Sequence, residues 1–122
     1  MKTIKIGLIG AGGNTRTRHI PGFKAIENIE LWAVANRSIE SSKKIAAEFG
    51  VREVAANWRQ IIENPDIDAV CIGTWPYMHC PITIAALENH KHVLCEARMA
   101  LNANEAHKML DVSRKNPDLI AQ

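Results

Sequence analysis

Near its start the chain carries a group of small residues that suits the binding of a dinucleotide pyrophosphate. Gly10, Gly12 and Gly13 follow an apolar run over residues 4–9, and a helical pattern begins a few residues later. In such a strand–turn–helix unit the first glycine permits a tight turn, and the second lets backbone N–H groups approach the phosphates. The start of the helix adds about half a positive charge. The spacing indicates a phosphate-binding turn made of Gly10, Gly12, Gly13, Asn14 and Thr15.

This glycine pattern alone does not establish phosphate binding. Thr15 occupies the third small position of the usual motif, and glycine turns also close ordinary βα units. A structural turn is therefore the alternative. Arg16 and Arg18 are the basic residues nearest to the turn, where they either reach the phosphates or remain exposed charges.

Further apolar runs predict the elements that must position this turn. Strands are expected over residues 4–9, 31–35, 51–55, 68–73 and 92–95, with another beginning at 119–121. Helices are expected after the glycine turn, capped by Asn14 or Thr15 and disturbed by Pro21, and over 39–49, 57–63, 81–88 and 102–115. Ser38, Asn57 and Asn102 are the predicted N-caps of the later helices, and Gly50 closes the second.

The strands are continuously apolar rather than alternating, which is typical of a parallel sheet covered on both faces. With right-handed βα crossovers the pattern predicts a doubly wound α/β fold, a single three-layer αβα domain over residues 1–122. The chain stops within the strand that begins at 119, so we expect it to be a fragment of a longer protein.

Composition and charge exclude several classes of partner. A net charge of +2 without a basic run argues against nucleic acid, and no apolar run approaches membrane-spanning length. Three cysteines, Cys71, Cys80 and Cys95, stand at no metal-ligand spacing, and two of them lie in apolar strand-like runs. Reduced, buried thiols favour a cytoplasmic protein. His90, His92 and His107 have no partners at metal spacing, so no metal site is expected.

Five motifs in order resemble the Gfo/Idh/MocA oxidoreductases, and the resemblance spans essentially the whole chain. The motifs are residues 10–13, 34–38, 64–70, 74–79 and 91–96. The resemblance implies a Rossmann domain that binds NAD or NADP. It also implies that a second α/β domain, absent from this chain, covers the nicotinamide and forms the substrate site.

Two departures from the family pattern stand out. The family usually has Glu-Lys-Pro after the fifth strand, with the lysine near the nicotinamide, whereas this chain has Glu96-Ala97-Arg98. Ala97 cannot transfer a proton, and the guanidinium of Arg98, although a possible catalytic charge, is not a proton-transfer group near neutral pH. The second departure is a glycine loop one residue longer before His19 than in typical members.

The end of the second strand normally selects between NAD and NADP. An acid there would bind the ribose hydroxyls and repel a 2′-phosphate. Here Asn36 removes that repulsion, Arg37 can pair with a phosphate or stack on adenine, and Ser38 follows. These residues favour NADP, or both cofactors. The alternative is that Arg37 is a solvated charge and Ser38 only a helix cap.

The loops after the fourth and fifth strands complete the predicted cofactor site. By resemblance, Thr74 and Pro76 line the nicotinamide-ribose side, Trp75 and Tyr77 wall the pocket, and Glu96 contacts that ribose. The alternatives are that Trp75 and Tyr77 cover the loop or dock on the missing domain, and that Glu96 is an ion-pair partner of Arg98 or Lys91. His79 is interpreted as a capping or positioning group, and His19 as packing near the glycine loop.

Together these features predict the cofactor domain of an oxidoreductase that transfers hydride between NAD(P) and a sugar, polyol or related hydroxy or carbonyl compound. The resemblance implies a catalytic base in the missing domain, so the chain alone is expected to bind cofactor without turnover. The full-length protein is expected to form a homo-oligomer. One alternative is a non-catalytic dinucleotide sensor or transcriptional regulator of the same family, and another is an unrelated glycine-loop binder such as a methyltransferase.

Overall fold

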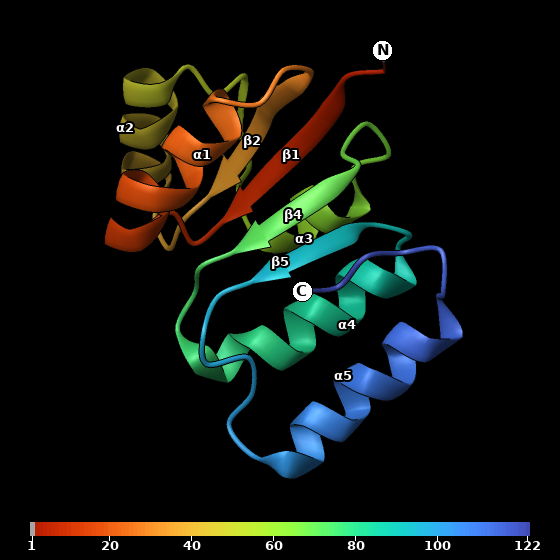
Figure 1. Ribbon diagram of the computed structural model, residues 1–122. Coiled ribbons are helices and arrows are strands. Elements are labelled where there is room, and N and C mark those ends of the chain that lie inside the picture. The colour runs from red at the N-terminus through yellow and green to blue at the C-terminus, as the bar shows by residue number, and fades with distance from the viewer. Residues whose placement is uncertain (1) are drawn as a thin grey trace.

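Five parallel strands form one sheet in the computed structural model, which describes residues 2–122. The strand order is β3-β2-β1-β4-β5, and Figure 1 shows that the arrows run in the same direction. The chain moves outward from β1 in one direction and then returns to begin again at β4, which confirms the predicted doubly wound fold. The strands are β1 (Ile4–Ile9), β2 (Ile29–Ala35), β3 (Glu53–Val54), β4 (Ala69–Ile72) and β5 (His92–Cys95).

Helices cover both faces of the sheet. The helical segments are η1 (Thr15–His19), α1 (Ile20–Lys24), α2 (Ile39–Phe49), α3 (Trp58–Glu63), η2 (Pro76–Met78), α4 (His79–Glu88) and α5 (Ala103–Lys115). The first two α-helices pack on one face, α3 and α4 pack on the other, and α5 lies along α4 (Figure 1). Among residues 2–122 no helix has the length and apolar content needed to cross a membrane.

Two apolar cores, one on each face, hold the layers together. Leu8 packs with Ile20 and Ile45 under α1 and α2, whereas its neighbour Ile9 packs with Ile61 on the α3 side. Successive strand residues point to opposite faces, so a strand buried on both sides must be apolar throughout. Each such fully buried side chain contributes about 1.5–3 kcal/mol relative to exposure.

Most predicted helix boundaries are confirmed. The side chains of Ser38, Asn57 and Asn102 accept hydrogen bonds from the amides of Ser41, Gln60 and Glu105, at 3.1, 3.1 and 2.9 Å. Each bond satisfies one amide of a first helical turn that has no partner within the helix. Gly50 ends α2 with a φ of 71°, the left-handed conformation that glycine adopts readily.

The helix after the glycine turn differs from the prediction at its start. The predicted capping by Asn14 or Thr15 is wrong, because helical structure is continuous over residues 13–24 and Asn14 is itself in the right-handed helical conformation without a side-chain cap bond. The predicted disturbance is seen as a change of helix type just before Pro21, within one continuous helical segment. One π-helical turn over Thr15–His19 precedes an α-helical turn that contains Pro21.

At the other end, the chain begins to pair with the outer edge of β5. Ala121 forms a parallel bridge with Val93, and the amide of Cys95 donates to the carbonyl of Gln122 at 2.7 Å. This pairing confirms the predicted onset of a strand at 119–121.

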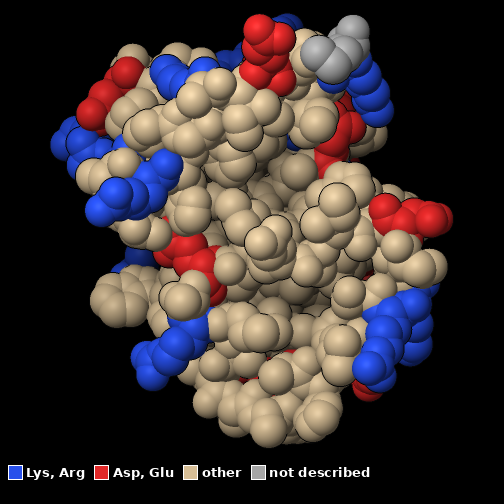
Figure 2. Space-filling view, viewed as in Figure 1, with Lys and Arg blue, Asp and Glu red and all other residues tan. Residues whose placement is uncertain are grey.

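Figure 2 shows charged side chains mainly around the margin of the face turned to the viewer, with an uncharged surface over its centre.

Candidate dinucleotide-binding site

A cleft of about 670 Å³ lies at the carboxyl ends of the parallel strands. Loops after β1, β2, β3 and β4 form its walls, which is the edge where open α/β sheets bind ligands. The predicted residues on its walls are Gly10, Gly12, Asn36, Arg37, Thr74, Trp75, Pro76 and Tyr77.

Gly10 is required by the protein's own backbone. Its φ is +79°, and a Cβ at this position would lie 2.7 Å from the amide nitrogen of Thr74 and 2.8 Å from the carbonyl carbon of Gly73. Gly73 is equally confined, because its Cβ would meet the carbonyl oxygen of Gly10 at 2.7 Å. The ends of β1 and β4 therefore approach each other through bare main chain.

Gly12 and Gly13 have no such internal reason to be glycine. A Cβ at either position would meet nothing within 4 Å, and neither residue has a positive φ. Within residues 2–122 the amides of Gly13 and Asn14 donate to no protein group, as expected for a first helical turn. Open space in front of unpaired N–H groups is what a pyrophosphate needs, so the residues present fit the diphosphate of a dinucleotide.

Thr15 lies beneath the loop rather than on the cleft wall. Its side chain is 2% exposed, and a Cβ on Gly73 would lie 2.6 Å from its Oγ1. The third small residue of the usual motif permits close packing of the helix on the sheet. Here the small residue at that contact is Gly73 on the facing strand end, which leaves room for Thr15.

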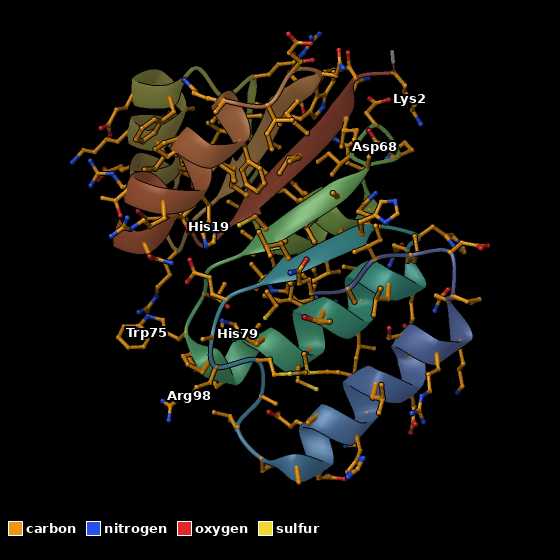
Figure 3. All side chains as sticks on the ribbon, in the orientation of Figure 1. Lys2, His19, Asp68, Trp75, His79 and Arg98 are labelled. Carbon is orange, nitrogen blue, oxygen red and sulfur yellow. The ribbon has the colours of Figure 1, made fainter. Side chains whose placement is uncertain are left out.

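Glu96, at the end of β5, is bonded to the first helix. One carboxylate oxygen, Oε1, accepts from Asn14 Nδ2 at 3.0 Å and from Thr15 Oγ1 at 3.3 Å, and it lies 2.9 Å from His19 Nε2. Glu96 therefore pairs with His19, and not with Arg98 or Lys91, the two ion-pair partners expected from the sequence. Figure 3 shows His19 directed from the first helix toward the sheet end.

Lys91, one of those two alternatives, is buried elsewhere. Its Nζ donates to the carbonyls of Asn64 and Ile67, each at 2.8 Å. Burial lowers the pKa of the Lys91 ammonium, and the Asp68 carboxylate opposes that shift. Lys91 therefore closes the turn between α3 and β4, away from the cleft.

The three predicted residues that follow β2 differ in their relation to the cleft. Asn36 Oδ1 accepts the amide of Ala11 at 2.7 Å, so this side chain faces the glycine loop. Ser38 Oγ caps α2, as described above, and it lies outside the cleft lining. Arg37 is exposed on the cleft wall, where its guanidinium is available to an anion.

The loop after β4 presents aromatic side chains outward and one histidine inward. Trp75 and Tyr77 are 64% and 57% exposed, and both line the cleft. His79 is 1% exposed, with Nε2 at 2.9 Å from the carbonyl oxygen of Thr74 and Nδ1 at 2.6 Å from that of Arg98. His79 thus joins the loop after β4 to the loop after β5, as expected for a positioning group.

Ala97 and Arg98, the departure from the family pattern, are both exposed. Figure 3 shows the side chains of Arg98 and Trp75 extending away from the ribbon on the same side of the molecule. Arg16 is exposed and pairs with Glu48 of α2, its guanidinium lying 3.1 and 3.2 Å from the two carboxylate oxygens. Arg16 is thus held in an ion pair within the protein, whereas Arg18 is exposed.

Among the described residues, neither the cysteine thiols nor the side chains that commonly bind metals form a second functional site. Burial raises the pKa of Cys71 to about 12, with smaller contributions from Glu96 and Cys95, so its thiol is neutral at pH 7. In the part of the chain that the structure describes, no three His, Cys, Asp or Glu side chains are grouped to hold a metal ion.

The sequence model of the Gfo/Idh/MocA family, described as an oxidoreductase family with an NAD-binding Rossmann fold, matches residues 4–121. The chain belongs to the Gfo/Idh/MocA oxidoreductase family. Two curated relatives are similar to this chain in sequence. A dTDP-3,4-didehydro-2,6-dideoxy-alpha-D-glucose 3-reductase from Streptomyces violaceoruber is 32% identical over all of this chain and 35% of its own length. A levoglucosan dehydrogenase from Pseudarthrobacter phenanthrenivorans is 33% identical over 95% of this chain and 32% of its own length.

Solved structures of related oxidoreductases superpose on the same domain. A 3-ketoreductase from Actinomadura kijaniata, crystallised with NADP and TDP-benzene, has a TM-score of 0.87 and 27% identity over 94% of this chain and 35% of its own. An oxidoreductase domain protein from Kribbella flavida reaches a TM-score of 0.92 with 28% identity, over 99% of this chain and 34% of its own. The chain spans about a third of the length of its relatives.

Several cleft residues were not anticipated from the sequence. Ala56, Asn57 and Trp58, which follow β3, line the same cleft, as do Ser41 and Met78. Topology could have indicated the first three, because the carboxyl end of every parallel strand meets one edge of the sheet. Ser41 and Met78 come from helical segments, and their position depends on how those segments pack.

Proposed function

We propose that this chain binds a nicotinamide dinucleotide, with the pyrophosphate beside Gly12 and on the amides of Gly13 and Asn14. The observation that carries the proposal is the pair of glycines facing open space beside unpaired first-turn amides. The protein's own packing does not require glycine there, whereas close approach of a diphosphate does.

The two ends of the cleft suit the two halves of such a cofactor. Arg37 stands at the β2 end, where the adenosine ribose of a Rossmann cofactor is bound. Thr74 and Pro76 stand at the β4 end, where the nicotinamide ribose would lie, and Glu96 Oε1 lies near Gly73 at the same strand end. The guanidinium of Arg37 is exposed, and its sequence neighbours Asn36 and Ser38 are not acidic. This arrangement favours binding of a 2′-phosphate, and hence of NADP over NAD alone.

As part of a longer protein, the domain would serve an oxidoreductase that acts on a sugar, a polyol or a related hydroxy or carbonyl compound. Relatives that reduce or oxidise sugar-like compounds support this assignment, and they favour it over a regulator. When bound, the nicotinamide ring supplies the hydride chemistry, and this chain's residues orient it. Neither the methyl group of Ala97 nor a guanidinium such as that of Arg98 is a proton-transfer group, so we expect the chain alone to bind cofactor without turnover.

Titration calorimetry on the 122-residue chain with NADP and NAD tests the proposal. We expect both to bind, NADP more tightly. Arg37→Ala should weaken NADP by about 10- to 100-fold, as for a lost charge-assisted hydrogen bond, and leave NAD within about twofold. No heat with either nucleotide would refute dinucleotide binding. Binding of NAD as tightly as NADP would refute the preference for NADP, and equal weakening of both by Arg37→Ala would refute its assignment to Arg37.

A further inference from the structure

The side chain of Asn36 is committed to the protein rather than to the cleft. Its Oδ1 accepts the amide of Ala11 at 2.7 Å, and its Nδ2 lies 2.8 Å from Ser41 Oγ and 3.4 Å from the carbonyl oxygen of Ala11. An asparagine amide offers two hydrogens and two lone pairs. Three of these four are directed at the glycine loop and the first turn of α2.

The main chain of Asn36 strengthens the same connection. Its amide donates to Ser42 Oγ at 2.8 Å, and that hydroxyl donates to the carbonyl of Ser38 at 3.1 Å. Ser42 is fully buried, so this part of the network is shielded from water. The end of β2 is therefore held to α2 by its backbone and to the glycine loop by its side chain.

Asn36 holds the backbone of the residue between the first two glycines of the loop. Ala11 lies between Gly10, which the β1–β4 contact confines, and Gly12, which faces open space. An amide side chain can satisfy both the N–H and the C=O of Ala11. A carboxylate at this position would accept the N–H but would place a second acceptor against the carbonyl.

We propose that Asn36 is a positioning residue that orients the glycine loop for the pyrophosphate and does not itself recognise the adenosine ribose. This inference rests on the proposed function and deepens it. It assigns discrimination between NAD and NADP to Arg37 alone. Asn36 instead contributes equally to the affinity for both cofactors. A residue in direct contact with the ribose would instead change their ratio.

The test measures four ligands on Asn36→Ala by titration calorimetry and NMR titration: NADP, NAD, ADP and adenosine 2′-monophosphate. The first three contain a pyrophosphate and the last does not. We expect Asn36→Ala to weaken NADP, NAD and ADP by a common factor of about 10 and to leave adenosine 2′-monophosphate unchanged. Ser41→Ala, which removes one partner of Asn36, should produce the same pattern with a smaller factor.

Asn102→Ala is the matched control, because Asn102 caps α5 and makes no contact with the loop. It should leave all four affinities unchanged. Hydrogen exchange provides a readout without any ligand: the Ala11 amide should exchange faster in Asn36→Ala than in the unmodified chain. Unequal losses for NAD and NADP, a loss for adenosine 2′-monophosphate, or affinities equal to those of the unmodified chain would each overturn the positioning role.

The hydrogen-exchange arm separates this inference from the proposed function. If the unmodified chain bound no dinucleotide, the proposed function would be refuted. The positioning role would then fail as well, even if Asn36 protected the Ala11 amide from exchange. If the chain bound dinucleotides but its Ala11 amide exchanged equally fast with and without the Asn36 side chain, only the positioning role would fail.

Discussion

Gly10 and Gly12 stand two residues apart in one loop, yet alanine at the two positions should have opposite effects. At Gly10 the positive φ alone costs a non-glycine residue about 1–2 kcal/mol. The added Cβ would also press on main-chain atoms of Gly73 and Thr74 at 2.7–2.9 Å. Such overpacking costs about 1–3 kcal/mol, so Gly10→Ala should lose roughly 2–5 kcal/mol of the free energy of unfolding. Small domains have about 5–15 kcal/mol in total.

Gly12→Ala should keep that stability and lose the ligand. Its φ is not positive and no atom lies within 4 Å of the added Cβ, so the folded state gains no strain. Lower entropy of the unfolded chain stabilises such a variant by about 0.4–1 kcal/mol. The new methyl group would, however, occupy the space in front of the first-turn amides. Loss of one charge-assisted hydrogen bond to the pyrophosphate would weaken NADP by roughly 10- to 150-fold.

Urea unfolding followed by circular dichroism, together with calorimetric titration of NADP, measures both quantities on each variant. Gly50→Ala is the control for the backbone term, because Gly50 has a similar φ of 71° but no atom near its added Cβ. The difference between Gly10→Ala and Gly50→Ala then gives the cost of the close β1–β4 approach. A Gly12→Ala variant that bound NADP as the unmodified chain does would show that no phosphate approaches this residue, and the proposed site would be refuted.

Three further substitutions test the packing around the site. Cys71→Ala should remove an alkaline loss of stability of about 1 kcal/mol at pH 10, because a thiol pKa raised from 9.0 to about 12 contributes stability that is full below pH 9 and is lost as the pH rises toward 12; urea unfolding across pH 8–10.5 measures it. Lys91→Met removes the ammonium from the carbonyls of Asn64 and Ile67, of which Asn64 keeps the amide of Ile67 at 3.2 Å, and should cost roughly 1–3 kcal/mol; an unchanged urea midpoint would contradict this. Gly73→Ala, which presses on Gly10, should lower both stability and NADP affinity.

Local chemistry explains which parts of this fold can be predicted from sequence. Ser38, Asn57 and Asn102 cap helices through bonds to amides three residues ahead, and Gly50 adopts its conformation without help from distant residues. Such interactions are encoded within four or five positions, so a single sequence is enough to find them. The continuous apolar strands likewise predict the parallel sheet from short stretches.

Contacts between distant residues explain what could not be predicted. Glu96 bonds Asn14 and Thr15 across more than 80 positions, and Asn36 bonds Ala11 across 25. Nothing in the local sequence around Asn14 signals that its side chain is used by a strand end elsewhere, so capping was the natural expectation. The partner of Glu96 was missed for the same reason, because His19 reaches it only once the first helix has packed.

The first helix begins with a π-helical turn over Thr15–His19. Such a turn contains about one residue more than an α-helical turn. Both of its ends contact the carboxyl end of the sheet: His19 lies 2.9 Å from Glu96, and Thr15 packs under Gly73. The π-helical turn therefore spans the two contacts that hold the first helix to the ends of β4 and β5.

Polar groups at this edge of the sheet consequently divide into two sets. Asn36, Glu96 and His79 make hydrogen bonds to neighbouring loops or to the first helix, whereas among the described residues the amides of residues 13–14 have no protein partner and Arg37 is exposed on the cleft wall. Changes in the first set disturb the shape of the loop, so they should alter the affinities for NAD and NADP together. Arg37 belongs to the second set, and under the proposed function its substitution should change the ratio of the two affinities, because its side chain would meet the 2′ position directly.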